Sequence, residues 1–325
     1  MQERAARLTL RAVEIFAATA REGSISGAAT ALGNSPATVS QQLSSLEAAL
    51  GVRLMDRAAR PVRLTPAGET FLRRARAILS EARLAQAELA RGDLARLPRL
   101  RLGMIEDFDV DVTPRLLTDL SALLSECRFT LETGPSLHLE NLLERRALDV
   151  IVAASGFDAA EGIDRFPLLE EPFAIVQPAD WPVTDTLPDA PYIAVSDKQL
   201  MGRQIARHLR ESAEVPPHRF ALDSYRAILA LVAGGEGWSI LPPLGWRYGA
   251  EFASGVALLP LPGASLTRRI DLSARSDVLG DIPAQIAARL AEALDDQVIA
   301  PSCARWPWLS GRLRLLTDQD ERIPL

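Results

Sequence analysis

SISGAATALGNSPATVSQQLSSLEAALGVRLMDRAARPVRLTPAG, residues 24–68, is the stretch that decides the fold of the N-terminal part of this chain. Ser24 or Ser26 predicts the start of a short helix, because a serine side chain accepts a hydrogen bond from a free N–H of the first turn. Gly33-Asn34 predicts its end in a tight turn, since both residues tolerate positive φ. Ser35-Pro36 then opens a second helix, which Gly51 ends.

The second helix, residues 36–50, has one apolar and one polar face. Its apolar residues recur at spacings of four and three, as shown by Val39, Leu43, Leu46 and Leu50. The opposite side is small, polar and uncharged, so it can lie close to base edges in a DNA major groove and offer them hydrogen bonds. We therefore predict a helix-turn-helix that reads DNA through Ser35, Pro36, Ala37, Thr38, Ser40 and Gln41.

A basic hairpin, residues 52–65, follows the helix-turn-helix. Such a wing suits contact with phosphates or insertion into the minor groove. The apolar side of a preceding helix, Leu8 to Glu22, completes a small core. The alternative is an ordinary helical subdomain with a solvated polar face, but the adjacent wing favours the DNA-binding interpretation. Its candidate contact residues are Arg53, Arg57, Arg60 and Arg63.

A long helix is predicted from Thr65-Pro66 to about Ala90, ending near Gly92. Its apolar stripe is too long for one small head to cover, so we expect a second copy of the helix to pair with it in a homodimer. The alternative is a helix packed on its own chain. The stripe consists of Phe71, Leu72, Ala75, Ile78, Leu79, Ala82 and Ala85.

After Leu97-Pro98 the periodicity changes to alternating strands and helices. The segment LDVIVA, residues 148–153, is almost entirely apolar, which is typical of a strand in a parallel sheet covered on both faces. This order predicts an α/β sheet with right-handed crossovers. The predicted strands are 99–104, 128–133, 148–153, 174–176, 192–195, 220–222, 238–241 and 270–274, and the clearest helices are 114–125, 137–146, 225–232 and 282–298.

Composition and charge are typical of a cytoplasmic protein of two or three domains. The 325 residues are 48% hydrophobic, contain no apolar run long enough to span a membrane and begin without a signal-peptide core. Cys127, Cys303 and the three histidines lack metal-ligand spacing, so we predict no metal and no other cofactor. Of the net charge of −6, residues 1–98 carry +5 and residues 99–325 carry −11. The positive field therefore coincides with the predicted DNA-binding head.

The head resembles the LysR-type transcriptional regulators over some sixty positions. Two positions depart from the family pattern: Met55 stands where the family usually has Phe, and Gln41 stands where many members carry Arg or Lys. The matching residues are Phe16, Gly23, Ser24, Ala28, Ala29, Leu32, Ser35, Val39, Ser40, Leu43, Leu46, Glu47, Leu50, Gly51, Leu54, Arg57, Arg60, Leu64, Thr65 and Gly68.

The resemblance implies an α+β multidomain protein with a winged helix-turn-helix at residues 1–64, a dimerisation helix at 65–92 and a two-lobed, periplasmic-binding-protein-like effector domain at 99–300. Lobe I would comprise about 99–176 and 274–300 and lobe II about 177–273, with crossovers near Gln177-Pro178 and within Asp271–Ala274. The resemblance further implies a homo-oligomer, which in this family is most often a tetramer. This oligomer would bind a dyad-symmetric promoter site in double-stranded DNA, a small-molecule effector and, if it activates transcription, RNA polymerase.

Ligands of α/β sheets bind at the carboxyl ends of strands, which places the effector between the lobes. Many family members have Ser or Thr at the positions of Ser136 and Ser196, but the first loop of this chain carries Glu106 and Asp107. Two acids favour a cationic, amine-bearing or hydroxyl-rich effector over a carboxylate, unless both point to solvent. The candidate residues are Ile105, Glu106, Asp107, Ser136, Ser155, Ser196, Asp223 and Ser224.

Other interpretations explain less of the chain. An α/β enzyme is disfavoured because there is no Gly-x-Ser-x-Gly elbow and no histidine beside a nucleophile. A winged-helix repressor of another class would leave unexplained the linker stripe and the family-like element AGGEGWSILP at 233–242. As a phosphate loop that element lacks Gly-Lys-Ser/Thr, so a sterically permissive turn is preferred. The extension at 301–325 carries Trp306, Trp308 and Leu309, which we expect to cap the body or an oligomer contact.

Overall fold

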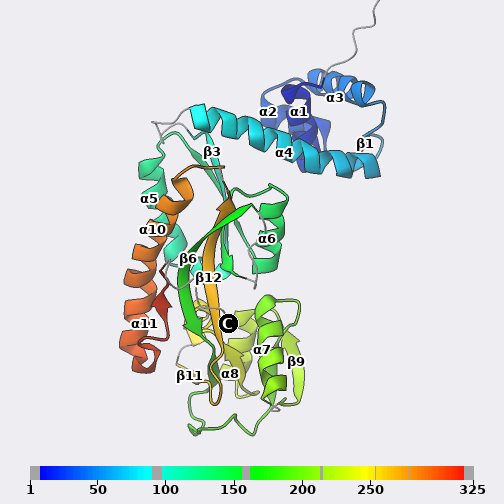
Figure 1. Cartoon of the computed structure of the whole chain (residues 1–325). Helices are drawn as coiled ribbons and strands as arrows, with labels where there is room; N and C mark the ends of the chain where they lie inside the picture. The colour runs from blue at the N-terminus through cyan, green and yellow to red at the C-terminus, as the bar shows by residue number, and fades with distance from the viewer. Residues whose placement is uncertain are drawn as a thin grey trace, which may run out of the picture. The chain divides into compact units, whose positions relative to one another are not determined.

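The computed structural model describes residues 8–89, 97–155, 162–212, 215–252, 254–276 and 278–317, and is drawn in Figure 1. The chain divides into two compact units, each with its own hydrophobic core. The N-terminal unit comprises Met1–Arg91 with Glu144–Ala147, and the C-terminal unit comprises Gly92–Leu143 with Leu148–Leu325. None of the described helices is long and apolar enough to cross a membrane.

The N-terminal unit has the predicted helix-turn-helix and wing. Ser24 and Ser35 cap their helices, accepting hydrogen bonds from the backbone N–H of Gly27 at 3.0 Å and of Thr38 at 3.1 Å. Gly33 has a φ of 63°, the left-handed conformation that the tight turn requires. The elements are α1 (Leu10–Glu22), α2 (Ile25–Leu32), α3 (Pro36–Leu50), β1 (Met55–Asp56), β2 (Arg63–Leu64) and α4 (Pro66–Leu89).

The first half of the apolar stripe on α4 packs against the core of the same head. Ala75 is fully buried, and Phe71 meets Phe16 edge-to-face with ring centroids 5.1 Å apart. Leu72 and Leu79 also pack against this core. The side chain of Ala85 and the predicted end near residue 92 lie outside the described residues. The head therefore covers more of the stripe than the sequence predicted.

Lobe I of the C-terminal unit is built on a six-stranded mixed sheet with the order β13-β6-β12-β5-β3-β4. Strand β3 is parallel to β4 and β5, whereas β12 is antiparallel to β5 and β6. Helices α5 and α10 lie on one side of this sheet and α6 on the other (Figure 1). The elements are β3 (Arg99–Met104), α5 (Val112–Leu123), β4 (Arg128–Thr133), α6 (Ser136–Glu144), β5 (Val150–Ala154), β6 (Ile163–Pro172), β12 (Thr267–Arg275) and α10 (Ile282–Leu294).

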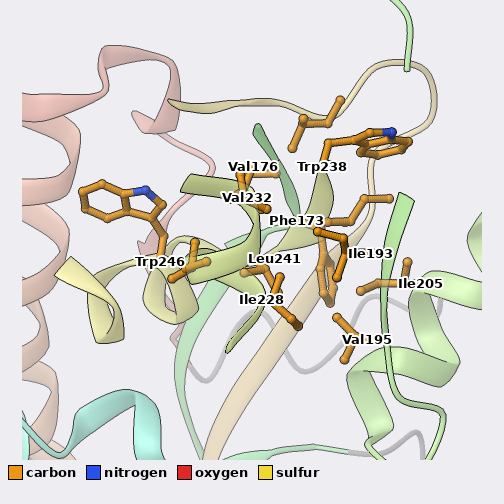
Figure 2. Close-up of a cluster of buried hydrophobic side chains, with 14 of the residues drawn as sticks. Phe173, Val176, Ile193, Val195, Ile205, Ile228, Val232, Trp238, Leu241 and Trp246 are labelled. Atoms are coloured by element: carbon orange, nitrogen blue, oxygen red, sulfur yellow. The ribbon is translucent and has the colours of Figure 1, made fainter. Parts of the chain in front are cut away.

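Lobe II has a three-stranded antiparallel sheet, β10-β7-β11, and a parallel pair, β8-β9, joined to it by a bridge between Tyr192 and Trp238. Its core gathers aliphatic side chains around Trp238 and Trp246, as Figure 2 shows. The elements are β7 (Ala174–Pro178), β8 (Tyr192–Val195), α7 (Leu200–Glu211), β9 (His218–Leu222), α8 (Tyr225–Ala233), β10 (Ser239–Leu241), α9 (Pro243–Tyr248) and β11 (Val256–Pro260).

Two long strands, β6 and β12, connect the lobes. They pair with each other along their length, with Thr267 opposite Pro172 at one end and Arg275 opposite Ile163 at the other. The chain therefore leaves the six-stranded sheet at Phe173 and returns at Thr267, a few residues before each predicted crossover. The sequence did not reveal β6, because Pro167 and Pro172 interrupt its strand pattern. The structure accommodates Pro167 beside a bulge in the pairing with β12.

The C-terminal extension packs on the body. Helix α10 continues through a π-helical segment (Asp295–Ile299) into α11 (Ala300–Arg305), followed by a 3₁₀ helix (Pro307–Leu309) and β13 (Arg314–Leu315), which pairs with β6. Trp306 meets Trp246 of α9 edge-to-face with centroids 4.6 Å apart, and Leu309 is completely buried. Of the two predicted roles for this segment, the structure shows the cap on the body.

Candidate functional site

The exposed face of α3 carries the side chains predicted to read DNA. Pro36, Ala37, Thr38 and Gln41 are exposed, and Ser40 is half-buried. Ser35 is exposed but also serves as the N-cap, and its hydroxyl lies 2.8 Å from that of Thr38. The face is therefore free of charge and of bulk, as a close approach to base edges requires.

Arg57 differs from the other arginines of the wing because it is tied to α3. Its guanidinium forms an ion pair with Glu47 and donates to the Ser44 hydroxyl at 2.9 Å. Glu47 also accepts hydrogen bonds from the backbone N–H of Leu54 at 2.8 Å and of Met55 at 3.1 Å. We predicted that Arg57 holds a phosphate; because its guanidinium is engaged by α3, we propose that it fixes the wing against the recognition helix.

Arg53, Arg60 and Arg63 are exposed. No hydrogen bond or ion pair joins their side chains to the part of the chain that the structure describes. Their guanidinium groups are therefore available to an anion.

A small pocket, of about 40 Å³, lies between the lobes at the carboxyl ends of β3 and β5. Lobe I supplies the loop after β3, the start of α6 and the end of β5, and lobe II supplies the starts of α7 and α8. Strand β12 crosses the floor. The lining residues are Ile105, Glu106, Asp107, Gly134, Pro135, Ser136, Ala154, Gln199, Leu200, Met201, Asp223, Tyr225 and Arg268.

A buried charge cluster of Asp107, Glu171, Tyr225 and Arg268 forms the floor of the pocket. The Arg268 side chain is 4% exposed and forms ion pairs with Asp107 and with Glu171, the latter at 2.7 Å. Its Nη1 donates to the Tyr225 hydroxyl at 3.3 Å. The second carboxylate oxygen of Glu171 accepts the backbone N–H of Leu244 at 3.0 Å. The cluster thus joins the loop after β3, both crossover strands and two helices of lobe II.

The pKa shifts in this region follow from burial and from a surplus of acids. Burial raises the pKa of Glu171 to about 7, although Arg268 opposes the shift. The two carboxylates raise the pKa of Arg268, so its charge is retained. Burial also raises the pKa of Glu106, and the nearby acids Asp107, Asp109 and Asp223 add to this effect. One guanidinium is therefore insufficient to neutralise the acids around the pocket.

Comparison with known proteins decides the family. Residues 10–69 match the model of the bacterial regulatory helix-turn-helix protein, lysR family, and residues 95–293, more than half of the chain, match the LysR substrate binding domain. The chain belongs to the LysR family of bacterial transcriptional regulators. It is a DNA-binding transcriptional regulator and not an enzyme.

One relative and two solved structures of the same fold match most of this LysR-family regulator. It is 30% identical over 294 residues to the "Probable hydrogen peroxide-inducible genes activator" of Mycobacterium leprae, covering 85% of this chain and 91% of the relative. A full-length OxyR variant from Pseudomonas aeruginosa shares the fold, with a TM-score of 0.71, 23% identity and coverage of 89% and 95%. Full-length CbnR in complex with its target DNA has a TM-score of 0.58, 22% identity and coverage of 89% and 99%.

The pocket contains five of the eight residues predicted to bind the effector, namely Ile105, Glu106, Asp107, Ser136 and Asp223. The other three do not line it. The Ser155 backbone N–H donates to the Arg269 carbonyl at 3.1 Å. The Ser196 hydroxyl accepts from the Lys198 N–H at 3.4 Å, and Ser224 is the N-cap of α8.

Tyr225 and Arg268 are the pocket residues that matter most among those the sequence analysis missed. In the strand TRRIDLSAR, Arg268 has the same parity as the apolar residues Ile270, Leu272 and Ala274. An arginine on the apolar side of a strand requires a buried partner, so this alternation was a usable signal. Glu171 likewise follows Leu169 by two positions. Nothing in the sequence paired Tyr225 with them.

The glycine-rich segment after α8 is a permissive turn, as preferred over a phosphate loop. Gly235 has a φ of 81°, and a side chain on Gly237 would meet the Pro191 carbonyl at 2.2 Å. Neither residue lines the interlobe pocket. The turn therefore serves the packing of lobe II.

Neither cysteine of this regulator lines the interlobe pocket. Both are free and half-buried. Burial raises the pKa of the Cys127 thiol to about 11, and the carboxylate of Asp149 adds to the effect. Since the thiolate is the reactive form, Cys127 is a poor nucleophile at neutral pH.

Proposed function

We propose that this LysR-family regulator binds a dyad-symmetric promoter site as a homo-oligomer and that a small molecule in the interlobe pocket changes its affinity for that site. The observation that carries the first part is the uncharged, exposed face of α3 beside the unpaired arginines Arg53, Arg60 and Arg63. Pro36, Ala37, Thr38 and Gln41 would face bases, and the three arginines would contact phosphates.

The oligomer in this proposal is a dimer through α4, and two dimers in a tetramer. The first half of the apolar stripe on α4 packs on its own head, so the dimer contact would fall on the C-terminal half of the helix. Two heads on one duplex explain a site with two half-sites, since dimer symmetry is mirrored in the DNA. RNA polymerase is a further partner if the regulator activates transcription.

The effector would act through coupling between two sites. Binding energy that differs between two arrangements of the oligomer shifts their populations, and the effect is reciprocal, so DNA changes effector affinity by the same factor. The buried charge cluster supports this part of the proposal, because it joins both lobes and both crossover strands at the pocket floor. A ligand that contacts the cluster would act on the hinge directly.

Footprinting on the promoter of its own gene tests the DNA-binding part. We expect protection of an inverted repeat by the wild-type protein. Gln41→Ala should lose about 1–3 kcal/mol of discrimination at one base pair in each half-site, because a bidentate glutamine contact is lost. Gln42→Ala, the same change one position along the helix, is the matched control. Equal losses on specific and random DNA for Gln41→Ala would exclude a base-reading role.

A further inference from the structure

The charge of the arginine in the interlobe pocket is already balanced by two buried acids, so it is a poor partner for an anionic ligand. Each of its three nitrogens already faces a protein acceptor: Nε lies 2.7 Å from Glu171, Nη1 lies 3.3 Å from the Tyr225 hydroxyl, and Nη2 pairs with Asp107. A ligand carboxylate that took over Nε or Nη2 would leave Glu171 or Asp107 buried without its counter-ion. Such a loss is costly in a site where the side chains of Asp107 and Glu171 are 3% and 0% exposed.

The acids of the pocket, by contrast, have unused acceptors. Asp107 receives Arg268 and the Tyr225 hydroxyl on Oδ1, and no described residue donates to its Oδ2. The carboxylates of Glu106 and Asp223 line the same pocket, and neither has a hydrogen bond or ion pair with a described residue. Asp107 is therefore a buried carboxylate that borders the cavity with one oxygen free.

Neighbouring negative charge makes this arrangement unfavourable without a bound cation. The pKa of Glu106 is raised by its burial and by three surrounding acids, so its ionised form is destabilised there. An ammonium group carries three N–H donors and one positive charge. Placed among Glu106, Asp107 and Asp223, it would satisfy free acceptors and neutralise the surplus charge. Hydrogen bonds between ionised partners are the strong ones.

The remaining walls favour a short, unbranched and partly apolar ligand. Ile105, Leu200 and Met201 present apolar surface, and the cavity is only about 40 Å³. The Ser136 hydroxyl accepts the Ala154 N–H at 3.1 Å, so its own proton is free to be donated. The pocket thus offers one acidic end and one short apolar wall.

We propose that the effector of this regulator is a short primary alkylamine, bound as its ammonium ion by Glu106, Asp107 and Asp223. The inference rests on the proposed function and names the chemical class of the ligand at that site.

Calorimetric titration of the full-length protein tests the proposal with n-butylamine, butyrate and 1-butanol, which share one chain and differ in charge. We expect n-butylamine to bind at least about tenfold more tightly than either other probe, from the value of a charged hydrogen bond. Tighter binding of butyrate, equal binding of all three, or no detectable binding of the amine would each overturn the proposal.

Two pocket variants and one control locate the binding. Glu106→Gln and Asp223→Asn should each weaken n-butylamine binding by about tenfold, while Glu251→Gln, an exposed acid paired with Arg226 outside the pocket, should not change it. Unchanged amine affinity in both pocket variants, each confirmed as folded by circular dichroism, would place the amine elsewhere and refute the assignment.

A separate readout distinguishes failure of this inference from failure of the proposed function. Promoter footprinting without any ligand reports on the head alone. If the promoter is protected and no amine binds, the ligand class is wrong while DNA binding stands. If the amine binds through Glu106 but promoter affinity is unchanged, the ligand class stands and the proposed coupling is wrong.

Discussion

In the wing, Arg53, Arg60 and Arg63 lie exposed without a partner among the described residues, whereas in the pocket Arg268 is buried and every one of its nitrogens faces an acceptor. The acids show the opposite distribution. Glu47 in the head is engaged by the wing, while the carboxylate of Glu106 lines the pocket with no bonded partner in the described part of the chain. The comparison teaches that a charged side chain can bind a ligand only through donors or acceptors that the fold leaves unused, as with the second carboxylate oxygen of Asp107.

Charge composition alone does not make this distinction. Residue type placed Arg57 among the candidate phosphate contacts and could not show that Asp107 pairs with an arginine. Arg57 holds the wing to α3, and Asp107 holds Arg268 in the pocket floor. We therefore expect the loss of Arg57 or Arg268, whose charges are paired within the fold, to lower stability first, and the loss of an exposed arginine of the wing to weaken DNA binding.

The largest effect is expected for Arg268→Met. Removing the guanidinium leaves Asp107 and Glu171 buried beside each other without a cation, which should cost about 3–5 kcal/mol of unfolding free energy. Urea denaturation followed by tryptophan fluorescence suits the test, because all five tryptophans lie between residues 181 and 308. Arg226→Met removes an exposed arginine that is also ion-paired, and should cost less than about 1 kcal/mol. Equal losses in the two variants would contradict the account.

A smaller loss of stability is expected for Arg57→Ala. The variant leaves Glu47 half-buried without its ion-pair partner, so the head should lose about 1–3 kcal/mol. The backbone N–H groups of Leu54 and Met55 donate to the Glu47 carboxylate, so faster hydrogen exchange at these two amides would show the loss directly. Arg53→Ala, an exposed change in the same wing, should leave their protection unchanged. Unaltered protection in Arg57→Ala would mean that the ion pair does not hold the wing.

The pH dependence of stability gives an expected effect of about the same size as that of Arg57→Ala. Glu171 is buried against Arg268, Asp107 and Tyr225, and its pKa rises from 4.5 to about 7 on folding. Its protonated form is therefore favoured in the fold, so this stabilisation is complete below pH 4.5 and is lost as pH rises through 7. Relative to wild type, Glu171→Gln should gain on the order of 2 kcal/mol between pH 5 and pH 8. A constant difference across that range would show that Glu171 stays ionised.

Local sequence signals predicted the head and the order of the body well. Ser24, Ser35 and Gly33 have local roles, as caps and in a tight turn, and such roles can be read from neighbouring residues. Strand β5 was visible because it is apolar on both faces. Strand β6 was not visible, because Pro167 interrupts the strand pattern of the sequence. In the structure this proline lies next to a bulge in the pairing with β12. Arg268 and Tyr225 meet only after both crossovers have formed, so no local pattern could join them.

The salt dependence of binding to a random DNA duplex tests the central claim most directly, because phosphate contacts do not require the specific site. Arg57→Ala and Arg60→Ala remove one arginine each from the same wing, one partnered and one free. Log K falls as log salt rises, and the account predicts that Arg60→Ala makes this slope less steep by about 0.9. Arg57→Ala, confirmed as folded, should leave the slope unchanged. An equal fall in both variants, or a fall in Arg57→Ala alone, would contradict it.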